Sequence, residues 1–591
     1  MIRRVPFLLL TLLPPLLWGG CSKQEEATPL LPLNPPGLFA PRPKDPSKVA
    51  WERELVLRLP SPPSSLNPLF VKDALSAAVA GLLYDSPFDV GPGMEFLVNP
   101  SMVESFRESP DGLTFTTVLK EGLKWQDGAP FTSEDFLFTF SLLRDKDVPV
   151  LLLKAGLDRV RKITAPDART IRVTFETPSP GNKWNLLLPV LPAHVWKPVR
   201  AGDPTLRKSR KALALARHPV GNGPYRLARF LPEEEVVLER WEGYPGPRPA
   251  FRRITWKVIP DRNAALLAFR AGELDALRVP HPADFLALGR DRALRGRAVL
   301  AKGDTWTYQF VAWNVSGRNP FFLDRRVRLA MACSLDRKSA VEKLFHGLFT
   351  LCAGPFHPSS PAADPSLSPI PYDPARAERL LDEAGWKVGP EGWRRRTCYF
   401  SPGEKGGWSL EPRPGAEARK ATFSFELLLP AGSTATTNLA LRWKDALARL
   451  GIEAKILALE RSAFQMRVLK SHAFDAAFWA WGPGVDPYTS EDIFGSRGWP
   501  EGKNLGGFCD PLLDSLYAEG AAERDPVLRM KIYRKICRRI REEQPYLFLW
   551  YLPDLWVFRP DIRGVGFGPR GALGFSPGIQ GWWAAAGEGR D

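Results

Sequence analysis

The feature that most constrains the fold of this chain is a strand–helix–strand pattern between residues 423 and 456. Large apolar residues occupy every second position over 423–429 and again over 452–456, which is the period of a strand. Between these runs, apolar residues recur at helical spacing and stop at Gly451. A connection long enough to hold a helix joins parallel strands. The pattern therefore predicts an α/β protein.

Two helix starts are also marked in the sequence. Thr132-Ser-Glu-Asp135 matches a capping box, in which the first and fourth side chains satisfy backbone N–H groups at the helix start. Asp373-Pro374 fits an N-cap followed by the first helical residue, and Gly385 ends the helical spacing that follows. Both segments are predicted to be helices.

The chain has 591 residues, more than one hydrophobic core usually supports, so two or more lobes are expected. A faint internal repeat agrees with two similarly built lobes. Residues 270–276 and 470–476 both end in Asp-Ala, follow a helical stretch and lead into a hydrophobic run. In each, a helix is predicted to end and a core strand to begin.

The N-terminus has the form of an export signal. Arg3 and Arg4 precede a Leu-rich run over 5–18, and Gly19-Gly20-Cys21 follows. The run is shorter than the ~20 apolar residues that span a bilayer. Small residues directly before a cysteine resemble a bacterial lipoprotein cleavage site, so residues 1–21 are predicted as a lipoprotein signal peptide with lipid on Cys21. The alternative is an uncleaved membrane anchor.

Residues 22–50 are predicted to form a Pro-rich tether. The stretch is polar at its start and rich in proline from 29 to 46, with little periodicity. Such a segment stays extended and is not expected to bury a core. A tether after a lipid site suits a protein that works beside a membrane.

The chain carries 81 Lys and Arg against 65 Asp and Glu, a net charge of +16. One local basic cluster runs from Arg207 to Arg217. An exported protein rarely meets nucleic acid, so no nucleic-acid partner is expected despite the basic charge. The remaining interpretations of the basic charge are a solvated basic face and contact with anionic lipid.

Cysteine and histidine give no sign of a metal site or cofactor. Beyond Cys21, five cysteines lack C-x-x-C spacing and allow at most two disulfides, and Cys333 and Cys352 are the closest pair. The six histidines are separated from one another. We therefore expect neither a metal centre nor a cofactor.

An exported hydrolase is the rival class of protein. Gly574-Phe-Ser576-Pro-Gly578 matches G-x-S-x-G, whose histidine partner follows the serine in the chain. Here the last histidine is His472, and Gly and Pro flank the serine, so the match is interpreted as a turn. No metalloprotease, P-loop or dinucleotide motif is present. The sequence favours a protein that is not an enzyme, with no catalytic residues.

A candidate binding site follows the apolar run 475–481. The run breaks into Gly482-Pro-Gly484-Val-Asp486-Pro487, and ligands in open α/β sheets bind beyond the carboxyl ends of strands. Trp479 and Trp481 share a face of this strand. Trp479 is interpreted as a core residue, whereas for Trp481 core and site stay open.

The order of several motifs resembles the family 5 bacterial solute-binding proteins, which include oligopeptide and dipeptide receptors. The matching segments cover roughly residues 50 to 565 in the family's order. They are Leu66-Asn67-Pro68, 109–116, 119–135, 219–227, 272–276, 324–330, 372–374 with 380–386, 450–452 and 475–482.

The resemblance implies a two-lobed, periplasmic-binding-protein-like flytrap fold. It places an N-terminal lobe at 51–302 with an extra subdomain inserted at about 91–214, a second lobe at 303–544, and a C-terminal return to the first lobe at 545–591. It also implies closure around a buried ligand, which gives an importer two distinguishable states.

By the same resemblance, the chain is an extracytoplasmic, membrane-anchored receptor that captures peptides for an ABC permease complex, as a monomer. A non-peptide solute, such as an oligosaccharide or a metal complex, is the alternative ligand. A ligand sensor that signals to a membrane partner would have the same sequence features.

The resemblance also names candidate ligand-binding residues. Peptide-binding relatives carry an aspartate three residues after the tryptophan equivalent to Trp481, and it pairs with the peptide amine. Here Gly484 stands at that position. Asp486 either takes over this role or matches a structural Asp-Pro of the family. Gly482 is another candidate, as are Tyr308, Trp313 and Asn314, for which a strand core is the alternative.

Overall fold

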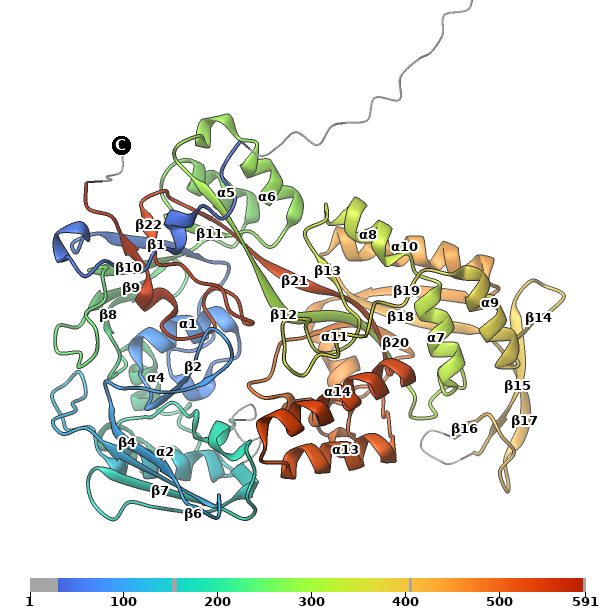
Figure 1. The fold of residues 1–591 in the computed structure, drawn as a ribbon, viewed down its shortest axis with the longest axis horizontal. Coiled ribbons are helices and arrows are strands. Elements are labelled where there is room, and N and C mark those ends of the chain that lie inside the picture. Colours follow the sequence, from blue (N-terminus) through green and yellow to red (C-terminus); the bar gives the residue numbers. More distant parts are fainter. Residues whose placement is uncertain (1–29, 151–156, 403–406, 588–591) are drawn as a thin grey trace, which may run out of the picture.

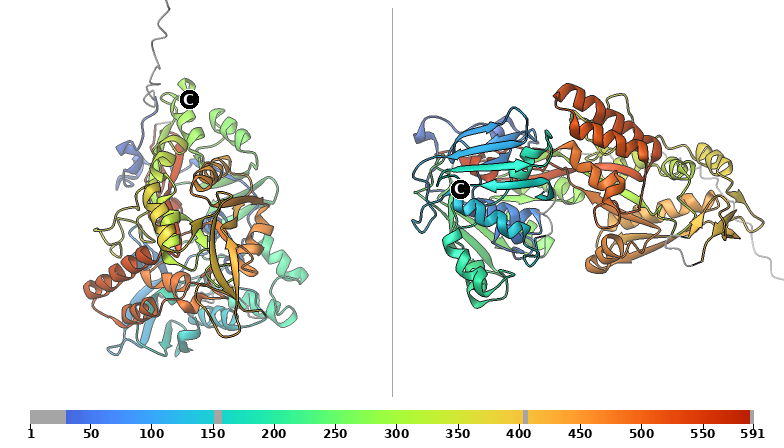
Figure 2. Two further views of the ribbon diagram at one scale, coloured as in Figure 1. Left: turned by 90° about the vertical axis from the view of Figure 1, so that its right-hand side faces the viewer. Right: turned by 90° about the horizontal axis from the view of Figure 1, so that it is seen from below.

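The computed structural model describes residues 30–150, 157–402 and 407–587, so Cys21 and the export signal lie outside it. The chain forms two bodies joined by two long antiparallel strands, β12 (Val299–Trp313) and β21 (Tyr546–Phe558) (Figure 1). Seen from below, the two bodies stand side by side (Figure 2). The predicted two-lobed α/β fold is confirmed.

In the eleven-stranded sheet that runs through both lobes, β13 (Thr350–Leu351) pairs with β21 off the main path, and the other ten strands follow the order β19-β18-β20-β12-β21-β11-β1-β10-β9-β8. The first three of these strands belong to the second lobe, and the last five to the N-terminal lobe. Their bounds are β1 Glu54–Leu59, β8 Tyr225–Leu231, β9 Glu235–Arg240, β10 Arg253–Val258, β11 Ala276–Arg278, β18 Ser424–Pro430, β19 Glu453–Leu459 and β20 Ala476–Trp481.

The strand–helix–strand unit found in the sequence is confirmed. β18 and β19 pair in parallel from Ser424 opposite Glu453 to Pro430 opposite Leu459. The helix between them, α10 (Thr434–Arg449), begins after Ser433, whose hydroxyl accepts from the N–H of Thr436. Its apolar stripe packs into the core of the second lobe.

The internal repeat corresponds to the same hydrogen bond, from a backbone N–H to an aspartate carboxylate, in both lobes. Helix α5 (Arg262–Arg270) precedes β11, and a helical segment ending at Lys470 precedes β20. In the first lobe, the carboxylate of Asp275 accepts from the backbone N–H of Val56 in β1 at 2.7 Å. In the second lobe, Asp475 accepts from the N–H of Glu426 in β18 at 3.0 Å. Each aspartate thus fixes the start of a core strand to its parallel neighbour.

A separate four-stranded sheet lies within residues 91–214, where an inserted subdomain is predicted. Helix α2 (Ser133–Arg144) covers it and begins with the predicted capping box of Thr132 and Asp135. Both oxygens of Asp135 are used, because one also accepts from the N–H of Ala193 at 2.7 Å. The strands are β4 Val103–Glu108, β5 Thr114–Leu119, β6 Val160–Thr164 and β7 Thr170–Phe175.

The described part of the predicted tether, residues 30–50, packs on the N-terminal lobe, which corrects the expectation that it buries nothing. Leu31 and Leu38 are buried, and the N–H of Leu30 donates to the carbonyl of Gly289 at 2.7 Å. Asn34 pairs through its side chain with the backbone of Lys302. The segment also forms two 3-10 turns, Pro36–Phe39 and Pro46–Lys48, and two of its leucines pack into the lobe.

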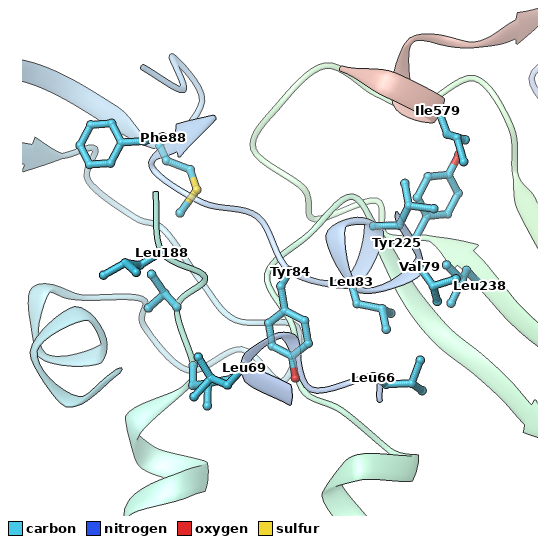
Figure 3. Packing of buried hydrophobic residues seen from close by; sticks show 14 of the residues in the cluster. Leu66, Leu69, Val79, Leu83, Tyr84, Phe88, Leu188, Tyr225, Leu238 and Ile579 are labelled. Atoms are coloured by element: carbon cyan, nitrogen blue, oxygen red, sulfur yellow. The ribbon is translucent and has the colours of Figure 1, made fainter. Parts of the chain in front are cut away.

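The N-terminal lobe has its main core around α1 (Ala74–Leu83), where Val79 lies beside Tyr225 of β8, Leu238 of β9 and Ile579 of the C-terminal segment (Figure 3). Ile562 and Trp582 belong to the same core. Residues after β21 therefore pack with the first lobe. The short strands β22 (Ile562–Arg563) and β23 (Trp583–Ala584) pair there.

The second lobe has a core on each face of its sheet. Val311, Trp313 and the stripe of α10 fill one, whereas Tyr308, Phe310 and helices α13 (Pro511–Ala522) and α14 (Pro526–Glu543) fill the other. The remaining longer helices are α3 Ala193–Gly202, α4 Arg210–Arg217, α6 Pro282–Gly289, α7 Arg325–Cys333, α8 Arg337–Leu344 and α9 Pro374–Glu383. The predicted N-cap of α9 at Asp373 is confirmed. No helix within the described residues is both long and apolar enough to cross a bilayer.

Candidate functional site: the cleft between the lobes

Two cavities lie between the lobes, of about 560 and 210 Å³. Both are bounded by Gly482 and Pro483, the loop that directly follows β20. The larger one extends to α1 and to residues 573–580 of the N-terminal lobe. The volume of the larger cavity lies in the range of small-ligand pockets. The two cavities therefore form one cleft with two compartments around a glycine-proline loop.

The smaller compartment, the aromatic cavity, is lined mainly by rings and apolar groups. Trp306 lies nearly parallel to His357, with ring centroids 6.2 Å apart, and its indole N–H donates to Ser359 Oγ at 2.9 Å. Burial lowers the pKa of His357 below its ordinary value, so the imidazole is neutral. Further aromatic and large apolar side chains of the wall are Met94, Trp184, Tyr308, Phe356, Ile493 and Met530.

The larger compartment, the charged cavity, has four ionisable side chains in its wall: Asp89, Arg278, Asp554 and Arg570. Asp554 accepts from Arg278 at 2.6 Å and from the N–H of Ala572 at 2.8 Å. Burial raises the pKa of Asp89, against a hydrogen bond from Ser576. This compartment suits a polar or charged part of a ligand.

Asp486 lies in the wall of the aromatic cavity, but its carboxylate is occupied. Arg529 donates to both oxygens, at 2.6 and 2.9 Å, and the N–H of Tyr488 donates at 2.9 Å. Burial opposes the charge of Arg529, yet the hydrogen bonds and charge of Asp486 outweigh it and hold the pKa of Arg529 above its ordinary value. Asp486 is thus part of a buried ion pair, 7% exposed on each side chain.

The same carboxylate connects the lobes. Trp184 of the inserted subdomain donates its indole N–H to Asp486 at 3.2 Å. Next to it, Ser179 Oγ donates to the carbonyl of Ala521 at 2.9 Å, and Arg524 pairs with Glu108 at 3.2 Å. The lobes therefore touch along one edge of the cleft, which shields the aromatic cavity.

The structure gives a steric reason for the glycine at position 484. A Cβ atom at this position would lie 1.7 Å from Thr489 Oγ1 and 2.8 Å from its Cβ. The Thr489 hydroxyl donates to the carbonyl of Asp486 at 2.7 Å, so it is fixed in that space. A side chain at position 484 is therefore excluded unless Thr489 moves.

The structure brings four of the predicted site residues, Tyr308, Gly482, Gly484 and Asp486, to the wall of the aromatic cavity. Trp481 pairs with Tyr308 in the sheet but packs against Phe310 and Trp479, with ring centroids 6.5 and 5.7 Å apart, outside both cavity walls. A direct contact of Trp481 with ligand stays a prediction.

For Trp313 and Asn314 the structure favours the core alternative. Trp313 stacks on Phe322, with centroids 4.6 Å apart, on the face of β12 opposite to Tyr308. Asn314 is fully buried and donates to the carbonyl of His472 at 3.0 Å. Neither residue belongs to the wall of a cavity.

Several residues of the cleft had no signal in the sequence. Trp184, Trp306, Phe356, Asp89 and Arg570 lie on separate segments that the fold alone brings together. Trp306 lies within a register shift of β12 between Asp304 and Tyr308, so strand alternation does not indicate its direction. Only the position of the loop after Trp481 was indicated by a rule for α/β sheets.

Other motifs of the sequence lie as follows. All five described cysteines are free, and only Cys509 is exposed. The described residues contain no group of three or more His, Cys, Asp or Glu that could hold a metal ion. Ser576 lies in the loop before a short 3-10 helix (Gly578–Gly581), in the wall of the charged cavity.

Comparison with known proteins supports the architecture. Over 542 residues the chain is 26% identical to the oligopeptide-binding protein AppA of Bacillus subtilis, covering 90% of this chain and 92% of AppA. It is 26% identical over 507 residues to the glutathione-binding protein GsiB of Escherichia coli O1:K1 / APEC, covering 84% and 88%.

Solved structures superpose over nearly the whole chain. The structure of AppA from Bacillus subtilis in complex with a nonapeptide matches with a TM-score of 0.73 and 24% identity, covering 91% of this chain and 100% of AppA. NikZ from Campylobacter jejuni in complex with Ni(L-His) matches with a TM-score of 0.71 and 21% identity, covering 90% and 99%.

A sequence profile described as "Bacterial extracellular solute-binding proteins, family 5 Middle" matches residues 98–499, which is more than half of the chain. The matched range includes most of the wall of the aromatic cavity and parts of both lobes. The chain belongs to the family 5 bacterial extracellular solute-binding proteins.

Proposed function

We propose that this protein captures peptides in the cleft between its lobes and passes them to an ABC permease complex in the membrane. The observation that carries the proposal is the pairing of two unlike compartments around Gly482 and Pro483. One is aromatic and the other is charged, and a peptide offers both apolar side chains and charged groups. Relatives whose names state peptide or glutathione binding support the same ligand class.

The contacts across the cleft support capture by closure. Trp184, Ser179 and Glu108 of the inserted subdomain each bind a residue of the second lobe. Such contacts stabilise a closed state that an importer can distinguish from an open one. A sensor would use the same closure with a different membrane partner.

The membrane attachment is part of the proposal. A lipid on Cys21 would hold the protein outside the cytoplasm at the membrane surface, and residues from Leu30 onward pack on the N-terminal lobe. The distance that the anchor allows is then set by the residues between these two points. We propose that the protein acts there as a monomer.

An oligosaccharide or a metal complex is the competing ligand class. Sugar rings stack on indoles, and Trp184 and Trp306 both line the aromatic cavity. A structural relative holds a nickel–histidine complex. The charged compartment, with two carboxylates and two guanidinium groups, favours a charged ligand such as a peptide over a neutral sugar.

The test is native mass spectrometry of the protein purified from its own cells, followed by denaturation to release and identify the ligand. Co-purified peptides of matching mass support the proposal. A sugar or metal complex recovered in their place would keep the receptor and refute the peptide. Titration of the emptied protein with the recovered compound then checks that binding is reversible.

A further inference from the structure

Three carboxylates line the cleft in the described part of the chain: Asp89, Asp486 and Asp554. Two of them are already paired with an arginine side chain. Asp486 is held by Arg529 at 2.6 Å, and Asp554 by Arg278 at 2.6 Å. A carboxylate with an arginine in contact has little to gain from a second cation, because its charge is already compensated.

Asp89 differs from the other two. It lies in β2 (Phe88–Val90) of the N-terminal lobe, partly exposed, in the wall of the charged cavity. One oxygen accepts from the N–H of Val90 at 2.8 Å, and Ser576 donates to the carboxylate. No described lysine or arginine lies within ion-pair distance. Arg570 attracts it only from further away and donates instead to the carbonyl of Pro483 at 3.4 Å.

The second lobe offers no replacement. At Gly484 the hydroxyl of Thr489 fills the space that a side chain would need, and the carboxylate of Asp486 is taken by Arg529. An ammonium group loses several kcal/mol of hydration free energy when it is buried, so it requires a counter-charge to compensate. In this cleft, that counter-charge has to come from the opposite lobe.

We propose that Asp89 binds the cationic end of the ligand, which for a peptide is its terminal ammonium group. The ammonium then lies in the charged cavity beside Ser576, and apolar side chains reach the aromatic cavity past Gly482 and Pro483. This assignment rests on the proposed peptide function. It places the amine contact in the N-terminal lobe.

The experiment compares two probes by calorimetry on the purified protein after its bound ligand has been removed: the pentapeptide Ala-Phe-Ala-Phe-Ala and its N-acetylated form. A charge-assisted contact predicts that acetylation weakens binding to the natural protein by about 10- to 100-fold. Asp89→Asn is expected to weaken the free peptide by the same factor and to leave the acetylated peptide unchanged. Asp89→Glu, which keeps the charge, should recover part of the loss.

The control is Asp445→Asn, which removes a carboxylate charge from an exposed residue of α10 outside both cavities. It is expected to bind both probes like the natural protein. If acetylation weakens binding and Asp89→Asn does not, the amine lies elsewhere and the assignment is overturned while the peptide function stands. If the natural protein binds neither probe nor any peptide recovered from cells, the peptide function fails and the assignment with it.

Discussion

Breaking the buried ion pair of Asp486 and Arg529 should destabilise the second lobe far more than it changes the choice of ligand. Arg529→Met removes the guanidinium and leaves the aspartate with Trp184 and the N–H of Tyr488. Asp486→Asn leaves the guanidinium with the carbonyl of Gly520, at 3.0 Å, as its main acceptor. Each change strands one charge in a site that is 7% exposed.

The expected loss of unfolding free energy follows from the burial of this ion pair. Removing one partner of a buried pair costs about 3–5 kcal/mol, against about 0–1 kcal/mol for a pair at the surface. Arg529→Met should fall near the lower end, because two donors still reach the carboxylate. The double variant Asp486→Leu with Arg529→Met removes both charges, so it should lose less than the sum of the single losses.

Urea unfolding followed by tryptophan fluorescence measures these losses, and a cycle of the single and double variants separates the coupling energy. A loss of this size shifts the midpoint by about 1 M for a protein with a slope near 3 kcal/mol per molar. The reasoning is refuted if each single variant loses less than about 1 kcal/mol, or if the losses simply add.

Three further changes test other parts of the structure. Trp306→Ala removes part of the aromatic wall and should weaken ligand binding about tenfold or more. Trp481→Ala should mainly lower the thermal midpoint of unfolding, because Trp481 packs against Trp479 outside both cavity walls. Equal losses of affinity in the two variants would place Trp481 in the site. Gly484→Asp should unfold at lower urea than the same change combined with Thr489→Ala, and no difference between the two would contradict the steric account. Cys21→Ser should release the protein from the membrane fraction, while retention of an uncleaved precursor there would favour a membrane-spanning anchor.

Local rules predicted much of the fold. The capping box at Thr132 and the parallel unit around α10 depend on residues close together in the chain, so spacing alone was sufficient. The repeat that ends in Asp275 and Asp475 was also readable, because each aspartate fixes the first residue of its strand. The proline-rich segment was misread, since its composition hid the leucines that pack on the lobe.

Most residues of the cleft wall could not be predicted from the sequence. Its walls come from segments hundreds of residues apart, such as Trp184, Trp306 and Arg529, and no local pattern distinguishes them from core residues. One error was avoidable: Tyr308 and Trp313 are five positions apart in one strand, an odd number, so they point to opposite faces. Only one of the two can line the cleft.

The position of β21 has a consequence for how the protein acquires its structure. Its residues Leu547 and Trp550 complete the core of the second lobe, and Trp556 and Phe558 complete that of the first. Its partner β12 ended more than two hundred residues earlier in the chain, so this pairing is of high contact order and slow to form. A chain that emerges from an export pore N-terminus first therefore exposes two unfinished apolar surfaces until its last segment arrives. The two lobes should then fold together at the end of translocation, and a chain truncated before Tyr546 should fold neither.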